Sequence, residues 1–308
     1  MAAITAQLVK ELRERTGAGM SDCKKALEAT GGDLDKAAGK LRMDGSAKAD
    51  KKAGRTAAEG VIALAQSASE IALVEVNCET DFVAKDKEFR ALAQRAAELV
   101  LKHKPASVEA LGQLGEGESL DTQRRGLVAK IGENMSIRRF EIISKAAGDL
   151  VTYIHPGDKI AVVVAMEKGE VERGRELAMH VAAMSPRYLA PSDVSPEHVA
   201  SERKVIEAQV AQEQAEEAAA GKKPKPAEII AKMVDGKLRK FASENALLGQ
   251  PFVRNEAYGL KSDEPVEKVL NLKGAKVSRF VRYGVGDGIE KKKTDFAAEV
   301  AAQAGIRA

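Results

Sequence analysis

The spacing of the hydrophobic residues changes at Gly60, and this change constrains the fold more than any other feature of the chain. Within residues 4–43, apolar side chains recur every three or four positions, which is the period of an amphipathic helix. From Gly60 the segments GVIALA and IALVEVN have a period of two and flank the turn-like QSASE. This pattern predicts an antiparallel hairpin, so a helical segment is followed by a sheet.

Three short helices are predicted before the sheet. The first begins at Thr5, whose hydroxyl can cap it, and ends at Gly17, where a left-handed residue is expected. The second covers residues 21–30 and the third residues 33–41, with glycines between them. The basic segment GSAKADKKAGRTAAEG that follows has no apolar period, and it is interpreted as a linker with some helix.

The order of hairpin, helix and return strand occurs twice along the chain. In the first half the hairpin is followed by a helix near residues 89–100 and by the strand IRRFEIIS. In the second half DLVTYIH, the turn PGD and KIAVVVAM form a hairpin, RGRELAMHVAAM a helix, and VSRFVRYGV a late strand. The predicted fold class is therefore α+β, with two related antiparallel-sheet subdomains.

A long helical segment interrupts the second subdomain. VASERKVIEAQVAQEQAEEAAA and AEIIAKMVDGKLRKFASE are separated by KKPKP, which predicts a projecting antiparallel helical hairpin. Its apolar stripe of Val199, Val205, Ile206 and Val210 is thin, which favours a solvated coiled-coil arm, with a protein contact as the alternative. The chain ends in the predicted helix TDFAAEVAAQAG.

The predicted domains follow from these elements. They are a three-helix module (1–54), a first core subdomain (55–146), a second core subdomain (147–191 with 244–285), the inserted arm (192–243) and a C-terminal helical module (286–308).

Composition excludes several classes of protein. The net charge is only +3, whereas a dedicated nucleic-acid binder carries a strongly basic face, so a protein partner is favoured. Two distant cysteines, Cys23 and Cys78, provide neither a disulfide framework nor a thiolate zinc site, which fits a reducing cytoplasm. No apolar run approaches the ~18 residues that span a bilayer, and the N-terminus lacks the apolar core of a signal peptide.

A search for reaction chemistry finds no candidate site. The histidines His103, His155, His180 and His198 lie at no metal-ligand spacing, and His180 is interpreted as a packing residue with a hydrogen bond. No phosphate-binding GxxxxGK[ST] loop occurs, and the glycines of YGVGDG are interpreted as a strand exit. An enzyme is disfavoured, and no cofactor, metal or directly bound nucleotide is expected.

One segment, NCETDFVAKDKEF, is more informative than the rest. It follows a predicted strand, and Thr80 or Asp81 can cap the next helix. Seven residues separate Phe82 from Phe89, so the spacing alone favours Phe82 as part of the apolar stripe of that helix, in the core or in a hydrophobic staple. A functional role for Phe82 is the alternative.

That segment and its neighbours resemble one known family. ITAQLVKELRERTGAGMSDCKKAL, EVNCETDFVAKDKEF, LVAKIGENMSIRR, AMHVAA, LLGQPFV and GDGIEKKKTDFAAEVA follow in the order found in the elongation factor Ts family. The departures KKPKPAE and GQLGEGESL fall where loops vary. The resemblance implies a guanine-nucleotide exchange factor that releases GDP from elongation factor Tu during translation elongation.

The same resemblance implies roles for particular residues. The stretch Thr80, Asp81, Phe82 and Val83 is expected to reach towards the magnesium site of Tu, where Asp81 and the Phe82 ring help to dislodge Mg²⁺. Met20 and His155 are carried over more loosely as further contacts with Tu. The hairpin tip that carries His155 is kept here but is followed by an added Pro156.

The three-helix module resembles ubiquitin-associated domains. The resemblance implies that it grips Tu together with the two subdomains and the C-terminal helix. A ubiquitin-associated-type adaptor without exchange activity is the alternative. A third hypothesis is a nucleic-acid binder that uses Lys48, Lys51, Lys52 and Arg55. Homodimer formation is left open.

Overall fold

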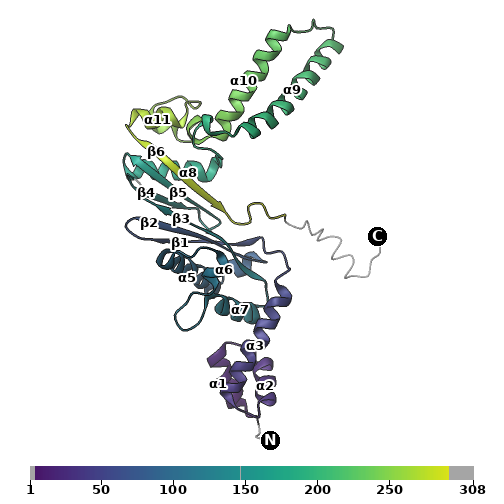
Figure 1. Cartoon of the computed structure of the whole chain (residues 1–308), viewed down its shortest axis with the longest axis vertical. Helices are drawn as coiled ribbons and strands as arrows, with labels where there is room; N and C mark the ends of the chain where they lie inside the picture. The colour runs from purple at the N-terminus through teal and green to yellow at the C-terminus, as the bar shows by residue number, and fades with distance from the viewer. Residues whose placement is uncertain (1–3, 146, 291–308) are drawn as a thin grey trace. The chain divides into compact units, whose positions relative to one another are not determined.

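The computed structural model describes residues 4–145 and 147–290, which divide into two compact units. The first unit contains residues 4–143, 156–160 and 283–290, and the second contains residues 144–145, 147–155 and 161–282. Each has a three-stranded sheet, ordered β1-β2-β3 in the first and β4-β5-β6 in the second (Figure 1). The chain is thus of mixed helix and sheet, as the change of hydrophobic period predicts.

The first unit begins with the three helices α1 (Ala6–Thr16), α2 (Met20–Ala29) and α3 (Leu34–Lys52). Thr5 caps α1 by accepting a hydrogen bond from the backbone N–H of Leu8 at 3.2 Å, and Gly17 ends it with a φ of 68°. Both predictions are confirmed. The helices share a small core of their own, in which Leu12 and Leu27 are fully buried.

Helix α3 extends well past the predicted end, so the expectation of a linker is wrong for residues 45–52. The small residues of this stretch face helix α7 (Leu120–Ile131), and a Cβ added to Gly45 would lie 3.0 Å from the Cβ of Ala129. Ala49 is only 3% exposed and belongs to the core under the first sheet. Close helix packing by small residues leaves no hydrophobic period in the sequence, which is why the pattern failed to predict it.

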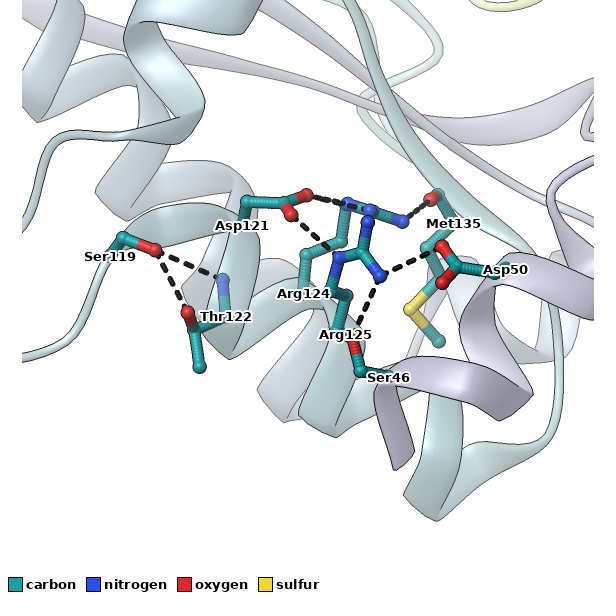
Figure 2. A network of polar contacts seen from close by, with 8 residues as sticks. All are labelled: Ser46, Asp50, Ser119, Asp121, Thr122, Arg124, Arg125 and Met135. Carbon is teal, nitrogen blue, oxygen red and sulfur yellow. Dashed lines mark hydrogen bonds and ion pairs between the residues drawn. The ribbon is translucent and has the colours of Figure 1, made fainter. Parts of the chain in front are cut away.

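Charged side chains fasten the same two helices together (Figure 2). Arg125 of α7 donates to the Ser46 hydroxyl at 2.8 Å and to Asp50 at 2.7 Å, both on α3. Burial raises the pKa of Asp121, but hydrogen bonds from Arg125 and Arg124 outweigh it and hold that pKa below its ordinary value. The three-helix bundle is therefore joined to the sheet by a packed helix.

The first sheet consists of β1 (Glu59–Gln66), β2 (Glu70–Cys78) and β3 (Met135–Ser144), and between β2 and β3 run α4 (Asp81–Ala84), α5 (Lys87–His103), α6 (Val108–Gly112) and α7. Strands β1 and β2 form the predicted antiparallel hairpin, with Leu64 opposite Leu73. Helices α5, α6 and α7 lie on one side of the sheet (Figure 1), and Phe89 of α5 is fully buried in the core beneath it.

A buried carboxylate of the first sheet holds the backbone at Gly286, which belongs to the same unit. Glu75 of β2 is fully buried and accepts hydrogen bonds from Arg138 at 3.0 Å, Arg139 at 2.6 Å and the backbone N–H of Gly286 at 2.8 Å. Burial raises the pKa of Glu75, but these donors together lower it below its ordinary value. Gly286 has a φ of 75°, and a Cβ there would lie 2.5 Å from the carbonyl oxygen of Ala58. Gly286, just after the strand Lys276–Gly284, thus allows a close approach of the backbone, which fits the predicted strand exit.

The second unit is built around its own sheet and helices: β4 (Leu150–Ile154), β5 (Ile160–Lys168), α8 (Val171–Met184), η1 (Pro191–Asp193), η2 (Leu247–Gly249), η3 (Asn255–Tyr258), α11 (Val266–Leu272) and β6 (Lys276–Gly284). Strands β4 and β5 pair antiparallel around the PGD turn, as predicted. Helix α8 lies so close to β4 that a Cβ on Gly174 would sit 2.6 Å from a methyl carbon of Val151.

His180 of α8 is fully buried within the second unit. The side-chain amide of Gln250 donates to the Glu244 carbonyl at 2.7 Å, so its oxygen is left to accept from His180 Nε2 at 3.0 Å. His180 Nδ1 accepts from the backbone N–H of Val253 at 3.3 Å. The ring is therefore neutral with its hydrogen on Nε2, and burial lowers its pKa to about 4. The interpretation of His180 as a packing residue with a hydrogen bond is confirmed.

The inserted segment forms a hairpin of two long helices, α9 (Pro196–Ala219) and α10 (Ala227–Asn245) (Figure 1). Ile206 and Val210 of α9 pack against Val234 and Leu238 of α10 in a separate apolar cluster. Val205, a member of the predicted stripe, is 47% exposed and lies outside that seam. The predicted C-terminal helix, residues 294–305, lies outside the described residues.

Candidate partner-binding site

The Thr80–Val83 turn follows the central strand of the first sheet. Strand β2 ends at Cys78, and Thr80 then caps the one-turn helix α4 by accepting a hydrogen bond from the backbone N–H of Val83 at 3.4 Å. Asp86 caps the next helix, α5, with bonds from Glu88 and Phe89 at 2.8 and 3.0 Å. The two helices are thus separate, with a break at residues 85–86.

This break overturns the prediction that Phe82 belongs to the apolar stripe of the long helix. Spacing relates Phe82 to Phe89 only if one helix runs through both, and α4 ends before α5 begins. Phe82 is 80% exposed, whereas its neighbour Val83 is 7% exposed and packs into the core under the sheet. The turn therefore presents an aromatic ring to solvent beside a buried aliphatic anchor.

A charged pair accompanies the exposed ring. Asp81 accepts a hydrogen bond from Lys85 Nζ at 2.8 Å, and this bond lowers the pKa of Asp81 below its ordinary value. The same ammonium lies 5.9 Å from the centre of the Phe82 ring. A carboxylate, an ammonium and an apolar ring are thus displayed together on one short turn.

Thr80, at the base of the turn, is held through three of its groups. Glu133 accepts hydrogen bonds from both its backbone N–H, at 3.0 Å, and its hydroxyl, at 2.7 Å. The thiol of Cys78 donates a hydrogen bond to the carbonyl oxygen of Thr80 at 3.1 Å. Burial raises the pKa of Cys78 to about 12, so this thiol is a packing group. Glu133 was not singled out from the sequence, because no local pattern relates it to a residue so far away.

The other two predicted contact residues are also at the surface of their own units. Met20 is the first residue of α2 in the first unit and is 56% exposed. His155 follows β4 in the second unit, is exposed, and lies with its Nδ1 3.0 Å from the Tyr153 hydroxyl. Both side chains are accessible to a partner.

Three of the four basic residues named for nucleic-acid binding, Lys48, Lys52 and Arg55, make contacts within the first unit. Lys48 pairs with Asp22 at 2.9 Å, Arg55 approaches Glu79 at 3.5 Å, and Lys52 donates to the carbonyl of Gly132. These cations brace helix α3 and its exit, which weakens the case for a free basic patch.

Within residues 4–145 and 147–290, no group of three or more His, Cys, Asp or Glu side chains could hold a metal ion. No helix in the same part of the chain is long and apolar enough to cross a membrane.

Comparison with known proteins gives a consistent picture. Residues 79–287 match the family model described as Elongation factor TS. The chain is 49% identical to the elongation factor Ts of Thioalkalivibrio sulfidiphilus and 50% identical to that of Hydrogenovibrio crunogenus, with 98% of each chain covered. It is 49% identical to the elongation factor Ts of Bordetella petrii, over 100% of both chains.

Proposed function

The chain belongs to the elongation factor Ts family, and we propose that its Thr80–Val83 turn is the part that acts on the nucleotide site of elongation factor Tu. Membership of this family makes the chain a guanine-nucleotide exchange factor for Tu in translation elongation. Its partner is therefore Tu, and it catalyses no chemical reaction of its own. We expect it to work in the cytoplasm, where translation takes place.

The observation that carries the proposal is the exposure of Phe82 at the end of a buried strand. Exposing 80% of a phenylalanine side chain forgoes the hydrophobic stabilisation that burial would supply. A single exposed apolar side chain is common, but this one stands on a capped turn beside the Asp81–Lys85 pair. An apolar ring that is held on a rigid turn can insert into a partner at little entropic cost.

The chemistry of the target explains what the turn does there. Mg²⁺ bridges nucleotide phosphates, so displacing it removes the largest local positive charge that holds GDP. We assign Asp81 and the ring of Phe82 to that displacement, with Thr80 and Val83 holding the turn in place. Because binding free energies are linked, GDP must weaken the binding of this chain to Tu by the same factor by which the chain weakens GDP binding.

The remaining parts are assigned to binding. We propose that the three-helix module, which resembles ubiquitin-associated domains, grips Tu together with the two related subdomains and the C-terminal module. Met20 and His155 are proposed as contacts with Tu, since both are exposed.

The proposed function is tested by timing nucleotide release. Tu is loaded with a fluorescent GDP analogue, mixed with excess unlabelled GDP, and the loss of signal is followed as the concentration of this chain is raised. Release is expected to accelerate and then to saturate. If the chain binds Tu in the same samples but never accelerates release, it is an adaptor without exchange activity.

A further inference from the structure

We propose that Glu133 is a positioning residue for exchange: it fixes Thr80 and thereby aims the ring of Phe82 at the nucleotide site of Tu. This inference rests on the function proposed above for the Thr80–Val83 turn. Glu133 lies just after helix α7, 53 residues from Thr80 in sequence, yet their side chains meet directly. Its two hydrogen bonds go to Thr80 and none goes to Phe82, so it acts on the ring through Thr80.

The geometry of the contact fixes orientation as well as position. Oε2 of Glu133 accepts from the backbone N–H of Thr80 at 3.0 Å, and Oε1 accepts from the hydroxyl at 2.7 Å. Hydrogen bonds to an ionised acceptor are the stronger kind, and two of them to one residue prevent it from rotating. Thr80 therefore has one orientation while Glu133 is in place.

That orientation is the one that caps helix α4. A hydroxyl has a single hydrogen, and Thr80 gives it to Glu133, so its lone pairs are left for the backbone N–H of Val83 at 3.4 Å. This second bond is the N-cap of the turn that carries Phe82. Glu133 thus selects the hydroxyl orientation on which the cap depends.

The segment that carries Glu133 is anchored on its other side. Gly132 ends α7 with a φ of 93°, and its carbonyl accepts a hydrogen bond from Lys52 at the end of α3. Asn134 is 5% exposed and donates from its side chain to the carbonyl of Arg55 at 2.8 Å. Glu133 therefore projects from a fixed turn, which allows it to immobilise another.

Phe82 needs such support because packing does not hold its ring. The side chain is 80% exposed, and α4 has only 4 residues. A helix of one turn is unstable alone, since its first hydrogen bond must offset the ordering of several residues. The bonds at Thr80 and the burial of Val83 therefore decide where the ring points.

The test replaces Glu133 with glutamine in the full chain. Glutamine is neutral, and with its oxygen on the Thr80 N–H its amide can only donate to the hydroxyl, so that hydrogen bond loses its charge and reverses its direction. At a saturating concentration of the E133Q chain, release of the fluorescent GDP analogue from Tu should be about tenfold slower than with the wild type. The concentration of chain that gives half the maximal rate should stay unchanged. A merely structural role would do the reverse, because fewer folded molecules raise the half-saturating concentration and leave the maximal rate alone. A wild-type maximal rate in E133Q overturns the proposal.

Two kinds of control variant are available. Glu70→Gln removes a carboxylate at the other end of β2, where it pairs with Lys104 at 2.7 Å, and should leave exchange unchanged. Thr80→Val loses the hydroxyl that bonds to Glu133 and should behave like E133Q. An equal loss in Glu70→Gln, or a normal rate in Thr80→Val, contradicts the proposal.

A double-mutant cycle separates this inference from the function on which it rests. If Glu133 acts through Phe82, then E133Q should slow exchange in the wild-type chain but cause no further loss in Phe82→Ala. Fully multiplicative losses would refute the positioning role and leave the role of the turn standing. A Phe82→Ala chain that exchanges at the wild-type rate would instead refute the role of the turn itself.

Discussion

Two neighbouring residues, Phe82 and Val83, have different roles in the Thr80–Val83 turn. Val83 is 7% exposed and packs into the core under the first sheet, while Phe82 is 80% exposed. Burial of one residue anchors the turn, and exposure of the next leaves an apolar ring free for a partner. Their substitution by alanine should therefore have opposite consequences.

We predict that Val83→Ala lowers the free energy of unfolding by about 2 kcal/mol, since it removes buried methyl groups and leaves a small cavity. Phe82→Ala should change it by no more than about 0.5 kcal/mol, as surface substitutions do. Urea unfolding of both variants beside the wild type measures the difference. If Phe82→Ala lowers the free energy of unfolding as much as Val83→Ala does, Phe82 is a core residue and not an exposed one.

His180 should make the second unit sensitive to acid. Its pKa is lowered from 6.5 in the unfolded chain to about 4 in the folded one, because burial disfavours the charged ring. The unfolded state therefore binds protons first, and stability falls as the pH drops from about 6.5 towards 4. The full loss is about 3 kcal/mol.

The contribution of His180 is isolated by His180→Asn, which cannot titrate. The difference in unfolding free energy between wild type and variant should shrink steadily as the pH falls through that window. A difference that stays constant with pH would show that His180 does not titrate in this way.

For single residues, the sequence predicted features that depend on the local pattern and missed contacts between residues far apart in the chain. The cap at Thr5 depends on a neighbour along the chain, and the packing role of His180 was anticipated from its apolar helix, although its partners Gln250 and Val253 are distant in sequence. The exposure of Phe82 depends on a break at residues 85–86, where a second cap at Asp86 overrides the helical spacing. The contact between Thr80 and Glu133 joins residues whose proximity only the folded sheet creates.

Among the elements, the α9–α10 hairpin is the most independent. Ile206, Val210, Val234 and Leu238 form an apolar cluster of their own along its seam. At its base, His198 bonds to Tyr188 at 2.8 Å and lies edge-on to Phe241, which ties the hairpin to the rest of the second unit. The outer part should therefore be removable if the base is kept.

We predict that replacing residues 203–235 by a short glycine-rich loop leaves a folded chain. Arg203 and Asp235 form an ion pair across the hairpin at 3.1 Å, so a short loop can close the gap. The free energy of unfolding should change by about 1 kcal/mol or less. A shorter connection costs less chain entropy to close, and this gain offsets the apolar contacts that are lost with the seam. Chemical unfolding monitored by circular dichroism measures this; an insoluble or non-cooperative product would show that the arm supports the sheet.

Helix α3 shows why one element was predicted too short. Its first half has the apolar spacing of a three-helix bundle, and its second half packs with Gly45 and Ala49, which add little to a hydrophobic pattern. The arm and both hairpins were predicted because their periods are long and regular. Small residues and charged contacts, such as those of Arg125, become informative only once their partners are known.

Over the whole molecule, we assign binding and exchange to different parts of the chain. In this proposal the Thr80–Val83 turn acts on the nucleotide site of Tu, and the three-helix module adds binding energy. Because residues 45–52 of α3 pack on α7, the module is joined to the first sheet without a flexible tether. A second contact that is already positioned strengthens binding, since less freedom is lost when both engage.

Deleting residues 1–43 should therefore weaken binding more than it slows exchange. The cut spares the part of α3 that packs on α7, so the sheet should stay folded. The concentration of chain that half-saturates GDP release should rise by about tenfold or more, while the maximal rate keeps a substantial part of its value. A folded truncation that saturates without accelerating release would assign the module a direct part in exchange.

The central claim is that Phe82 helps to displace Mg²⁺ from Tu, and one measurement tests it most directly. GDP release is timed with saturating wild-type or Phe82→Ala chain, first with Mg²⁺ present and then after EDTA has removed it. The account predicts a rate about tenfold slower for Phe82→Ala with Mg²⁺, and a much smaller difference after EDTA, because the assisted step has then already happened. A folded Phe82→Ala chain that releases GDP at the wild-type rate in the presence of Mg²⁺ would contradict it.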